Sequence, residues 1–288
     1  MDTQQLQAFV TVSRLGSFSR AAEQLFLTQP AISKRIDKLE QQLNVRLFDR
    51  IGRHVNLTDA GLVLLPKAHN ILDILEDTSR EINNLAGQVA GQLRIATSHH
   101  ISLHRLPPHL RAYQQSYPQV KLDIQFAESE VIHQGLLEGL WEIGIITLNP
   151  HPHERLEQQV IWQDAMHFVG APHHPLAQAK NVTLEDLSNY PALLSKPGTF
   201  TRELLSQRFD EANIDLQVAT STNNLDTLRM LVSTGMGWSL LPHSLLNGEL
   251  KSIATDTSTI VRNLGCVWHQ QRSLSNAAQQ FIAHLHEH

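Results

Sequence analysis

The chain has 288 residues, of which 41% are hydrophobic and 18% charged, so it is long enough for about two domains and too apolar to be disordered. Its formal net charge of -5 gives no overall indication of nucleic-acid binding. The charge is uneven, however: eight Lys/Arg stand against four Asp/Glu between Arg14 and Arg53, and 13 against 18 after Gly91. A basic N-terminal segment is therefore joined to a larger acidic part.

The single cysteine, Cys266, excludes an intrachain disulfide and lies in an apolar run, as expected of a buried strand thiol. The first residues lack the basic and apolar regions of a signal peptide, and no run of about 18 apolar residues indicates a transmembrane helix. These patterns favour a cytoplasmic protein with no membrane partner.

The first 45 residues predict a helix-turn-helix. Ser17 and Ser19 are candidate N-caps of a short helix, and Thr28 can cap the next helix, whose first turn tolerates Pro30. The apolar residues of this second helix form one stripe: Ile32, Ile36, Leu39 and, at its end, Leu43. The opposite side is polar and basic, which suits either an ordinary solvated surface or a DNA-contacting one.

A hairpin, or wing, is predicted next by the alternation around Gly52, and its tip carries Arg50 and Arg53. Thr58 can then cap a long helix that runs to about Ala86. This helix contains a heptad seam: Leu65, Ala68, Leu72, Leu75, Ser79, Ile82 and Ala86. The seam favours dimerisation through the helix, and the alternative is an amphipathic helix that packs on its own domain.

After a small, polar stretch at 86–92, strands and helices alternate, which indicates parallel sheets covered by helices. This segment is long for a single sheet, so we expect two subdomains with a cleft. The predicted domains are 1–58, a linker helix at 59–87, and 88–288. The last comprises subdomain I (about 92–162 plus 263–288) and subdomain II (about 163–262). The predicted fold class is thus α+β and α/β.

The segment S-F-S-R-A-A-E-Q-L-F-L-T-Q-P-A-I-S-K-R-I-D-K-L-E, with L-F-D-R and L-T-D-A-G after it, closely resembles the DNA-binding segment of LysR-type transcriptional regulators. Weaker similarity, as in L-V-S-T-G-M-G-W-S-L-L-P, extends through the second half. The resemblance implies a winged helix-turn-helix, a linker-helix homodimer and an effector-binding domain like periplasmic binding proteins. It also implies a homotetramer, a dimer of dimers that binds inverted repeats in promoter DNA, with RNA polymerase as a further candidate partner.

The second helix of the helix-turn-helix would place its N-terminal residues in the major groove. There Gln29 can pair with adenine, Ser33 can bond a base edge or phosphate, and Pro30 can contact a thymine methyl. Basic side chains of the helix and wing suit phosphates or groove edges. The candidate DNA-binding residues are Ser17, Ser19, Arg20, Thr28, Gln29, Pro30, Ser33, Lys34, Arg35, Lys38, Arg50 and Arg53.

An effector cavity is expected at the carboxyl ends of the parallel strands, near helix N-termini. The candidate effector-binding residues are Ser98, His99, His100, Ser129, Thr147, Ser195, Lys196, Thr199, Thr201 and Asn223. Hydroxyls and Lys196 suit a small anionic metabolite, but Glu128 and Glu130 would oppose a purely anionic one, so a polar or amino-acid-like ligand remains open. Helix capping is the alternative role for any single hydroxyl.

Other function classes are less favoured. The 17 histidines raise the alternative of a metal-responsive regulator, although no H-E-x-x-H or C-x-x-C spacing occurs. Nucleophile-elbow, P-loop and dinucleotide-binding motifs are also missing, so we expect no enzyme, no catalytic residues and no cofactor beyond a small-molecule co-inducer. A stand-alone solute-binding protein would not carry residues 1–60.

Overall fold

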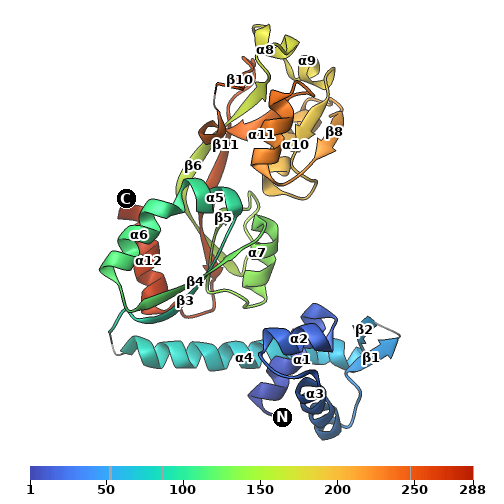
Figure 1. The fold of residues 1–288 in the computed structure, drawn as a ribbon, viewed down its shortest axis with the longest axis vertical. Helices are drawn as coiled ribbons and strands as arrows, with labels where there is room; N and C mark the ends of the chain where they lie inside the picture. The colour runs from blue at the N-terminus through green and yellow to red at the C-terminus, as the bar shows by residue number, and fades with distance from the viewer. Residues whose placement is uncertain (52–53, 86, 247, 288) are drawn as a thin grey trace. The chain divides into compact units, whose positions relative to one another are not determined.

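The computed structural model describes residues 1–51, 54–85, 87–246 and 248–287. It divides into two units, Met1–Ala86 and Gly87–His288, which are treated separately below (Figure 1).

The N-terminal unit is a winged helix-turn-helix followed by a long helix. Its elements are α1 (Thr3–Leu15), α2 (Phe18–Gln24), α3 (Gln29–Leu43), β1 (Phe48–Ile51), β2 (His54–Leu57) and α4 (Asp59–Leu85). The strands pair antiparallel, which confirms the predicted hairpin. Ile32, Ile36 and Leu39 of α3 are buried against α1 and α2, which confirms the stripe. Leu43 is 37% exposed in the last turn, so its place in the stripe was wrong.

The long helix α4 divides into two parts by burial. Thr58 caps it through a bond from the Gly61 N–H to its hydroxyl, at 3.1 Å. Along the predicted seam, Ala68 is buried, and Leu65 and Leu72 pack on the core of the N-terminal unit. Further on, apolar side chains are exposed: Ile74, Leu75, Ile82 and Leu85. The first part of the seam therefore packs on its own domain, and the second part does not.

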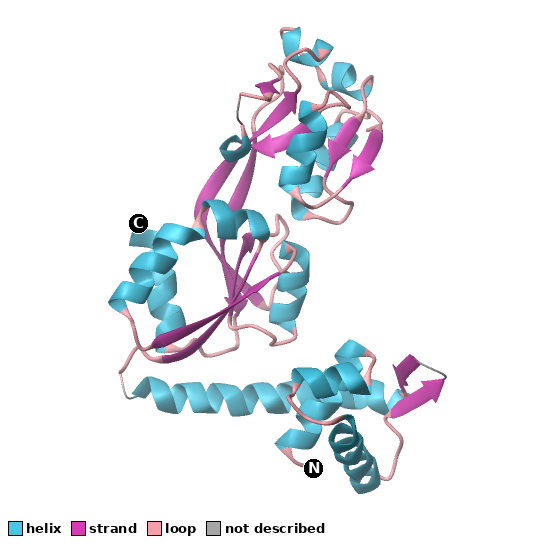
Figure 2. Cartoon of the chain, in the orientation of Figure 1, coloured by secondary structure: helices cyan, strands magenta, loops and turns pink. Residues whose placement is uncertain are grey.

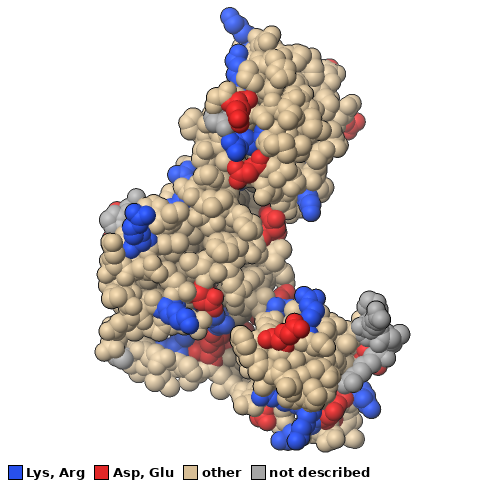
Figure 3. Space-filling view, in the orientation of Figure 1, with Lys and Arg blue, Asp and Glu red and all other residues tan. Residues whose placement is uncertain are grey.

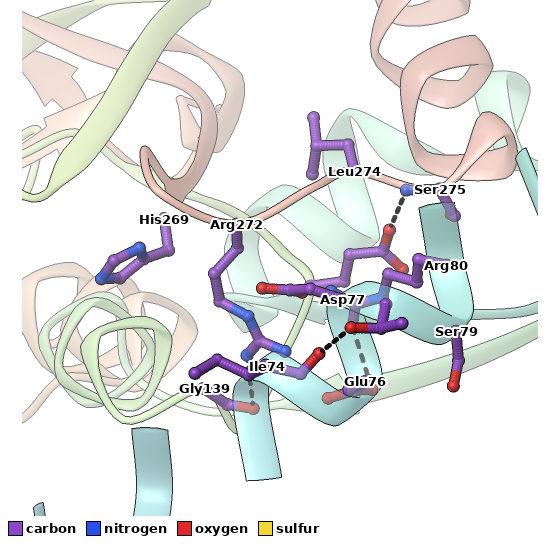
Figure 4. A network of polar contacts seen from close by, with 12 residues as sticks. Ile74, Glu76, Asp77, Ser79, Arg80, Gly139, His269, Arg272, Leu274 and Ser275 are labelled. Atoms are coloured by element: carbon purple, nitrogen blue, oxygen red, sulfur yellow. Dashed lines mark hydrogen bonds and ion pairs between the residues drawn. The ribbon is translucent and has the colours of Figure 1, made fainter. Parts of the chain in front are cut away.

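Charged side chains support the exposed part of α4. Arg80 forms ion pairs with Glu76 at 3.0 Å and with Asp77 at 3.1 Å, which are the i,i+4 and i,i+3 neighbours expected on a helix surface (Figure 4).

The C-terminal unit contains a mixed seven-stranded sheet and a small parallel pair. Its strands are β3 (Gly91–Thr97), β4 (Val120–Phe126), β5 (Ile143–Thr147), β6 (Leu156–Gly170), β7 (Ala192–Leu194), β8 (Val218–Ser221), β9 (Ser239–Pro242), β10 (Lys251–Ser252) and β11 (Ile260–His269). Its helices are α5 (His99–His104), α6 (Leu106–Ser116), α7 (Ser129–Leu137), α8 (Pro175–Gln178), α9 (Leu184–Ser188), α10 (Phe200–Glu211), α11 (Leu225–Ser233), the 3-10 helix η1 (His243–Leu245) and α12 (Asn276–Glu287).

Two long strands correct the expectation of purely parallel sheets. The pairs β3 with β4, β3 with β5, and β7 with β8 are parallel, as predicted. In contrast, β6 and β11 run antiparallel to each other, and β11 is antiparallel to β5. They pass from half I, built around β3 to β5, to half II, built around β7 to β9 (Figures 1 and 2).

Each half has its own core. In half I, Ile95, Tyr113 and Phe281 bring together β3, α6 and α12, while α7 covers the other face of the sheet. The turn before α12 is held by bonds from Ser275 N to Glu142 (2.6 Å) and from Arg272 Nη1 to the Gly139 carbonyl (3.2 Å; Figure 4). Cys266 of β11 is buried, as predicted, and burial raises the pKa of its thiol to about 12.

Half II packs α10 and α11 on opposite sides of β7 and β9. Trp238, Phe168 and Phe209 are central to one cluster, and Leu193 and Val232 belong to the other. A capping box between Thr183 and Asp186 begins α9. The sequence did not predict α5, α8, β7, η1, β10 or the first half of β6.

Candidate functional site

The N-terminal end of α3 is exposed. Thr28 is its N-cap residue, but its side chain makes no capping hydrogen bond, contrary to expectation. Gln29 Nε2 donates to Ser33 Oγ at 2.9 Å, so the two predicted base-contacting side chains lie together one turn apart. Lys34 and Lys38 are exposed on the same helix, and basic side chains are visible around α3 (Figure 3). This end of α3 is thus polar, cationic and accessible.

Of the remaining candidates for DNA contact, some are hydrogen-bonded within the N-terminal unit and others are exposed. Arg35 Nη2 donates to Gln4 Oε1 on α1 at 2.9 Å, so this guanidinium is held within the unit. Ser17 caps α2 by accepting from the Arg20 N–H at 3.3 Å, while Ser19 and Arg20 are exposed. Arg53 and the Arg50 side chain lie outside the described residues.

The hairpin is fixed to α3 by Glu40, which the sequence did not single out. This buried carboxylate accepts from the Leu47 N–H at 2.7 Å and the Phe48 N–H at 3.3 Å. Arg46 Nη1 lies 3.8 Å from its other oxygen. Because Leu47 and Phe48 lead into β1, this carboxylate sets where the hairpin begins relative to the helix.

Phe26, in the turn before α3, was also missed. It has a φ of 53°, in the left-handed region that a bulky side chain rarely adopts, and its side chain is 96% exposed. Neither local propensity nor burial favours phenylalanine at this position.

A cavity of about 330 Å³ lies in the C-terminal unit. Nine of the ten predicted effector-binding residues line it: Ser98, His99, His100, Ser129, Thr147, Ser195, Thr199, Thr201 and Asn223. The tenth, Lys196, is exposed and is not among the lining residues. Its backbone N–H donates to Asn223 Oδ1 at 3.0 Å, and its carbonyl accepts from the Thr199 hydroxyl at 3.0 Å. His99 and His100 are the first two residues of α5.

Several hydroxyls of the cavity also have structural roles. Ser129 Oγ accepts from the Thr147 N–H at 3.1 Å, and Thr199 caps α10 by accepting from Arg202 N at 3.3 Å. Ser98 stands at the N-cap of α5 without a side-chain capping bond. Capping and lining are therefore combined in Thr199, while Ser98 has no capping function.

The cation of the cavity is Arg262, which lies inside β11 and is 4% exposed. Its Nη2 donates to Asp164 Oδ2 at 2.6 Å, and its Nη1 to Thr201 Oγ1 at 3.4 Å. Its Nε is buried and has no hydrogen-bond partner among the described residues. The sequence could not identify Arg262 as a cavity residue, because a single arginine in an apolar strand does not show which residue it will face.

Asp164 holds two more groups. Arg105 Nη2 donates to its Oδ1 at 2.7 Å, and His100 Nε2 lies 3.6 Å from its Oδ2. Burial alone would raise the pKa of Asp164, but the bond with His100 and the charge of Arg262 outweigh it and lower that pKa. Burial lowers the pKa of His100, which keeps this imidazole neutral at pH 7. Two guanidiniums thus share one carboxylate, leaving an excess of positive charge beside the cavity.

Within the described residues, no three His, Cys, Asp or Glu side chains come together as a metal site would require. No helix in the described part of the chain is both long and apolar enough to span a membrane.

Comparison with known proteins gives a consistent result over the whole chain. The family model "Bacterial regulatory helix-turn-helix protein, lysR family" matches residues 3–62, and "LysR substrate binding domain" matches 86–288. The chain is 65% identical over 108 residues to an uncharacterized HTH-type transcriptional regulator in the ibpB-leuC intergenic region of Azotobacter vinelandii, covering 38% of this chain and 75% of that protein.

Two further similarities cover nearly the full length. The chain is 31% identical to the transcriptional regulator YeiE of Escherichia coli K12, over 96% of this chain and 94% of YeiE. The structure of full-length CbnR complexed with its target DNA matches with a TM-score of 0.64 at 23% identity, covering 100% of this chain and 99% of CbnR, which shows a shared fold. These are matches to regulators of transcription and not to enzymes. The chain belongs to the LysR family and is a DNA-binding transcriptional regulator with an effector-binding domain.

Proposed function

We propose that this regulator binds inverted repeats in promoter DNA as a dimer of dimers, and that a small polar or anionic metabolite in the cavity modulates its output. The observation that carries the DNA part is the exposed N-terminal end of α3, where Gln29 and Ser33 are adjacent and Lys34 and Lys38 are free of the core. The shared fold with CbnR, whose structure contains target DNA, supports this assignment.

The dimer would form through the second part of α4. Ile82 is 62% exposed and Leu85 is 87% exposed, and apolar side chains in such a row gain stability from a partner helix. Pairing two copies of α3 on one duplex would explain recognition of an inverted repeat. A regulator that binds promoter DNA would act in the cytoplasm, and RNA polymerase is a candidate partner.

The effector part rests on the cavity. Hydroxyls from both halves and the buried Arg262 offer hydrogen-bond donors for a small oxygen-rich ligand, while Glu128 and Asp226 place negative charge on the lining. A ligand that contacts both halves would change their relative position, and this would alter the geometry of the DNA-bound assembly.

Gln29 provides the test. Sequencing of footprinted genomic DNA identifies a bound site, and fluorescence anisotropy then compares that site with a random duplex. We expect Gln29→Ala to weaken specific binding by about 1–3 kcal/mol and to leave random binding unchanged, because an adenine pair would be lost. Gln41→Ala is the matched control, since Gln41 is an exposed glutamine near the other end of α3. Equal effects of the two variants would contradict the assignment of α3.

A further inference from the structure

Helices α7 and α10 meet across the cavity. Glu130, in the first turn of α7, accepts a hydrogen bond from the backbone N–H of Phe200 at 2.8 Å. Phe200 is the first residue of α10, and first-turn amides have no partner within their own helix. A carboxylate at this position is also stabilised by the helix dipole. A side chain from half I thus binds the N-terminus of a helix in half II.

A second contact accompanies this bond. His133, one turn further along α7, packs edge-on against the Phe200 ring with centroids 5.7 Å apart, and both side chains are buried. Glu130 is itself partly buried, and burial raises the pKa of its carboxyl, an effect that the Phe200 bond opposes. Two side chains of α7 therefore hold one residue of α10.

A buried hydrogen-bond donor without an acceptor among the described residues lies next to this contact. Thr201, the second residue of α10, accepts from Arg262, whose buried Nε has no partner among the described residues. The cluster of Arg262, Arg105 and Asp164 has one more positive than negative charge. Glu130 and Arg262 both line the cavity together with Glu128 and Asp226, so the groups that suit an oxyanion there are Arg262 and the N-terminus of α10.

We propose that Glu130 is an internal ligand of the effector cavity: its carboxylate occupies the anion-binding N-terminus of α10, and the carboxylate of an effector replaces it there. The effector would then be a small carboxylate. It would replace the bond between Glu130 and the Phe200 N–H with a bond between its own carboxylate and that N–H. The two halves are held together by the chain's own carboxylate before the effector arrives. This deepens the proposed function and rests on it.

Removal of the Glu130 carboxylate should leave the N-terminus of α10 open to a carboxylate from solution. In full-length Glu130→Ala protein, sodium acetate at tens of millimolar should raise the melting temperature by about 2–4 °C, as a ligand that binds only the folded state does. Sodium chloride at equal ionic strength and neutral acetamide should not. Wild type should show no acetate-specific shift, because its position is filled.

Glu138→Ala is the matched control: Glu138 lies at the other end of the same helix and is not among the residues that line the cavity, so its loss should not create acetate binding. Should Glu130→Ala fail to fold, Glu130→Ser carries the same expectation, since serine suits a first helical turn. A folded Glu130 variant without an acetate response, or an equal response in wild type, would overturn the proposal. Failure of the proposed function itself would appear separately, as loss of site-specific DNA binding by wild type.

Discussion

Arg262 and Asp164 are direct cross-strand partners on β11 and β6, and their side chains meet at 2.6 Å between Nη2 and Oδ2. Both residues are almost fully buried, and the strands that carry them connect the two halves of the C-terminal unit. Arg262 also lines the cavity. This pair thus lies both on the strands that connect the two halves and at the cavity where we propose that the effector binds.

Loss of Arg262 should destabilise the C-terminal unit. Arg262→Met leaves Asp164 buried with Arg105 as its remaining guanidinium, and breaking a buried pair costs about 3–5 kcal/mol. Urea unfolding followed by circular dichroism measures the change. The exposed Arg111 is the control, and Arg111→Met should change the free energy of unfolding by less than about 0.5 kcal/mol. Similar effects of both variants would contradict the assigned role of the pair.

Glu40 should matter for both stability and DNA binding. Glu40→Ala leaves the Leu47 and Phe48 amides without their acceptor, so we expect a loss of about 1–3 kcal/mol in the N-terminal unit. Binding to random DNA should weaken as well, because the hairpin loses its attachment to α3. Glu23→Ala, which removes an exposed carboxylate of α2, serves as the comparison. Unchanged melting in Glu40→Ala would argue against this anchor.

Phe26→Asn should stabilise the protein. The backbone at Phe26 is left-handed, and asparagine tolerates that conformation better by up to about 1 kcal/mol. Little burial is lost, because the ring is 96% exposed. Phe26→Ala removes the ring without favouring the conformation, so differential scanning calorimetry should show a higher melting temperature for Asn than for Ala. The reverse order would count against backbone strain at this turn.

Ile82→Glu should reduce self-association. The isoleucine is exposed in the single chain, so its replacement should leave the fold intact while placing charge in the proposed helix pair. Analytical ultracentrifugation should show a smaller species at micromolar concentration. Asn83→Glu adds the same charge at the next exposed position and should keep the wild-type mass. If both variants sediment like wild type, α4 does not form the dimer in this way.

Stability should fall between pH 7 and pH 5, in part through His100. Burial lowers the pKa of His100 below its ordinary value of 6.5, so the unfolded state binds the proton more readily. Stability is therefore lost as the pH falls through 6.5. His100→Gln should flatten this dependence by at most about 1.4 kcal/mol per pH unit, measured by urea unfolding at several pH values. An unchanged slope would mean that His100 is solvated.

Local pattern in the sequence determined much of the architecture. The stripe of Ile32, Ile36 and Leu39 and the hairpin of β1 and β2 depend on residues a few positions apart, and the structure confirms them. The candidate effector-binding residues were expected at the carboxyl ends of strands and near helix N-termini, and nine of the ten line one cavity. Strand periodicity and the position of ligands at strand ends are enough for these predictions.

Tertiary structure alone decided which distant groups meet. Arg262 and Asp164, Glu130 and Phe200, and Glu40 and Leu47 become partners only when separate elements pack, and none of them has a sequence signature. The antiparallel course of β6 and β11 likewise depends on pairing between strands far apart in the chain. Hydrophobic periodicity specifies which face of an element is buried, whereas the partner of a buried charge is set by the register and position of a second element.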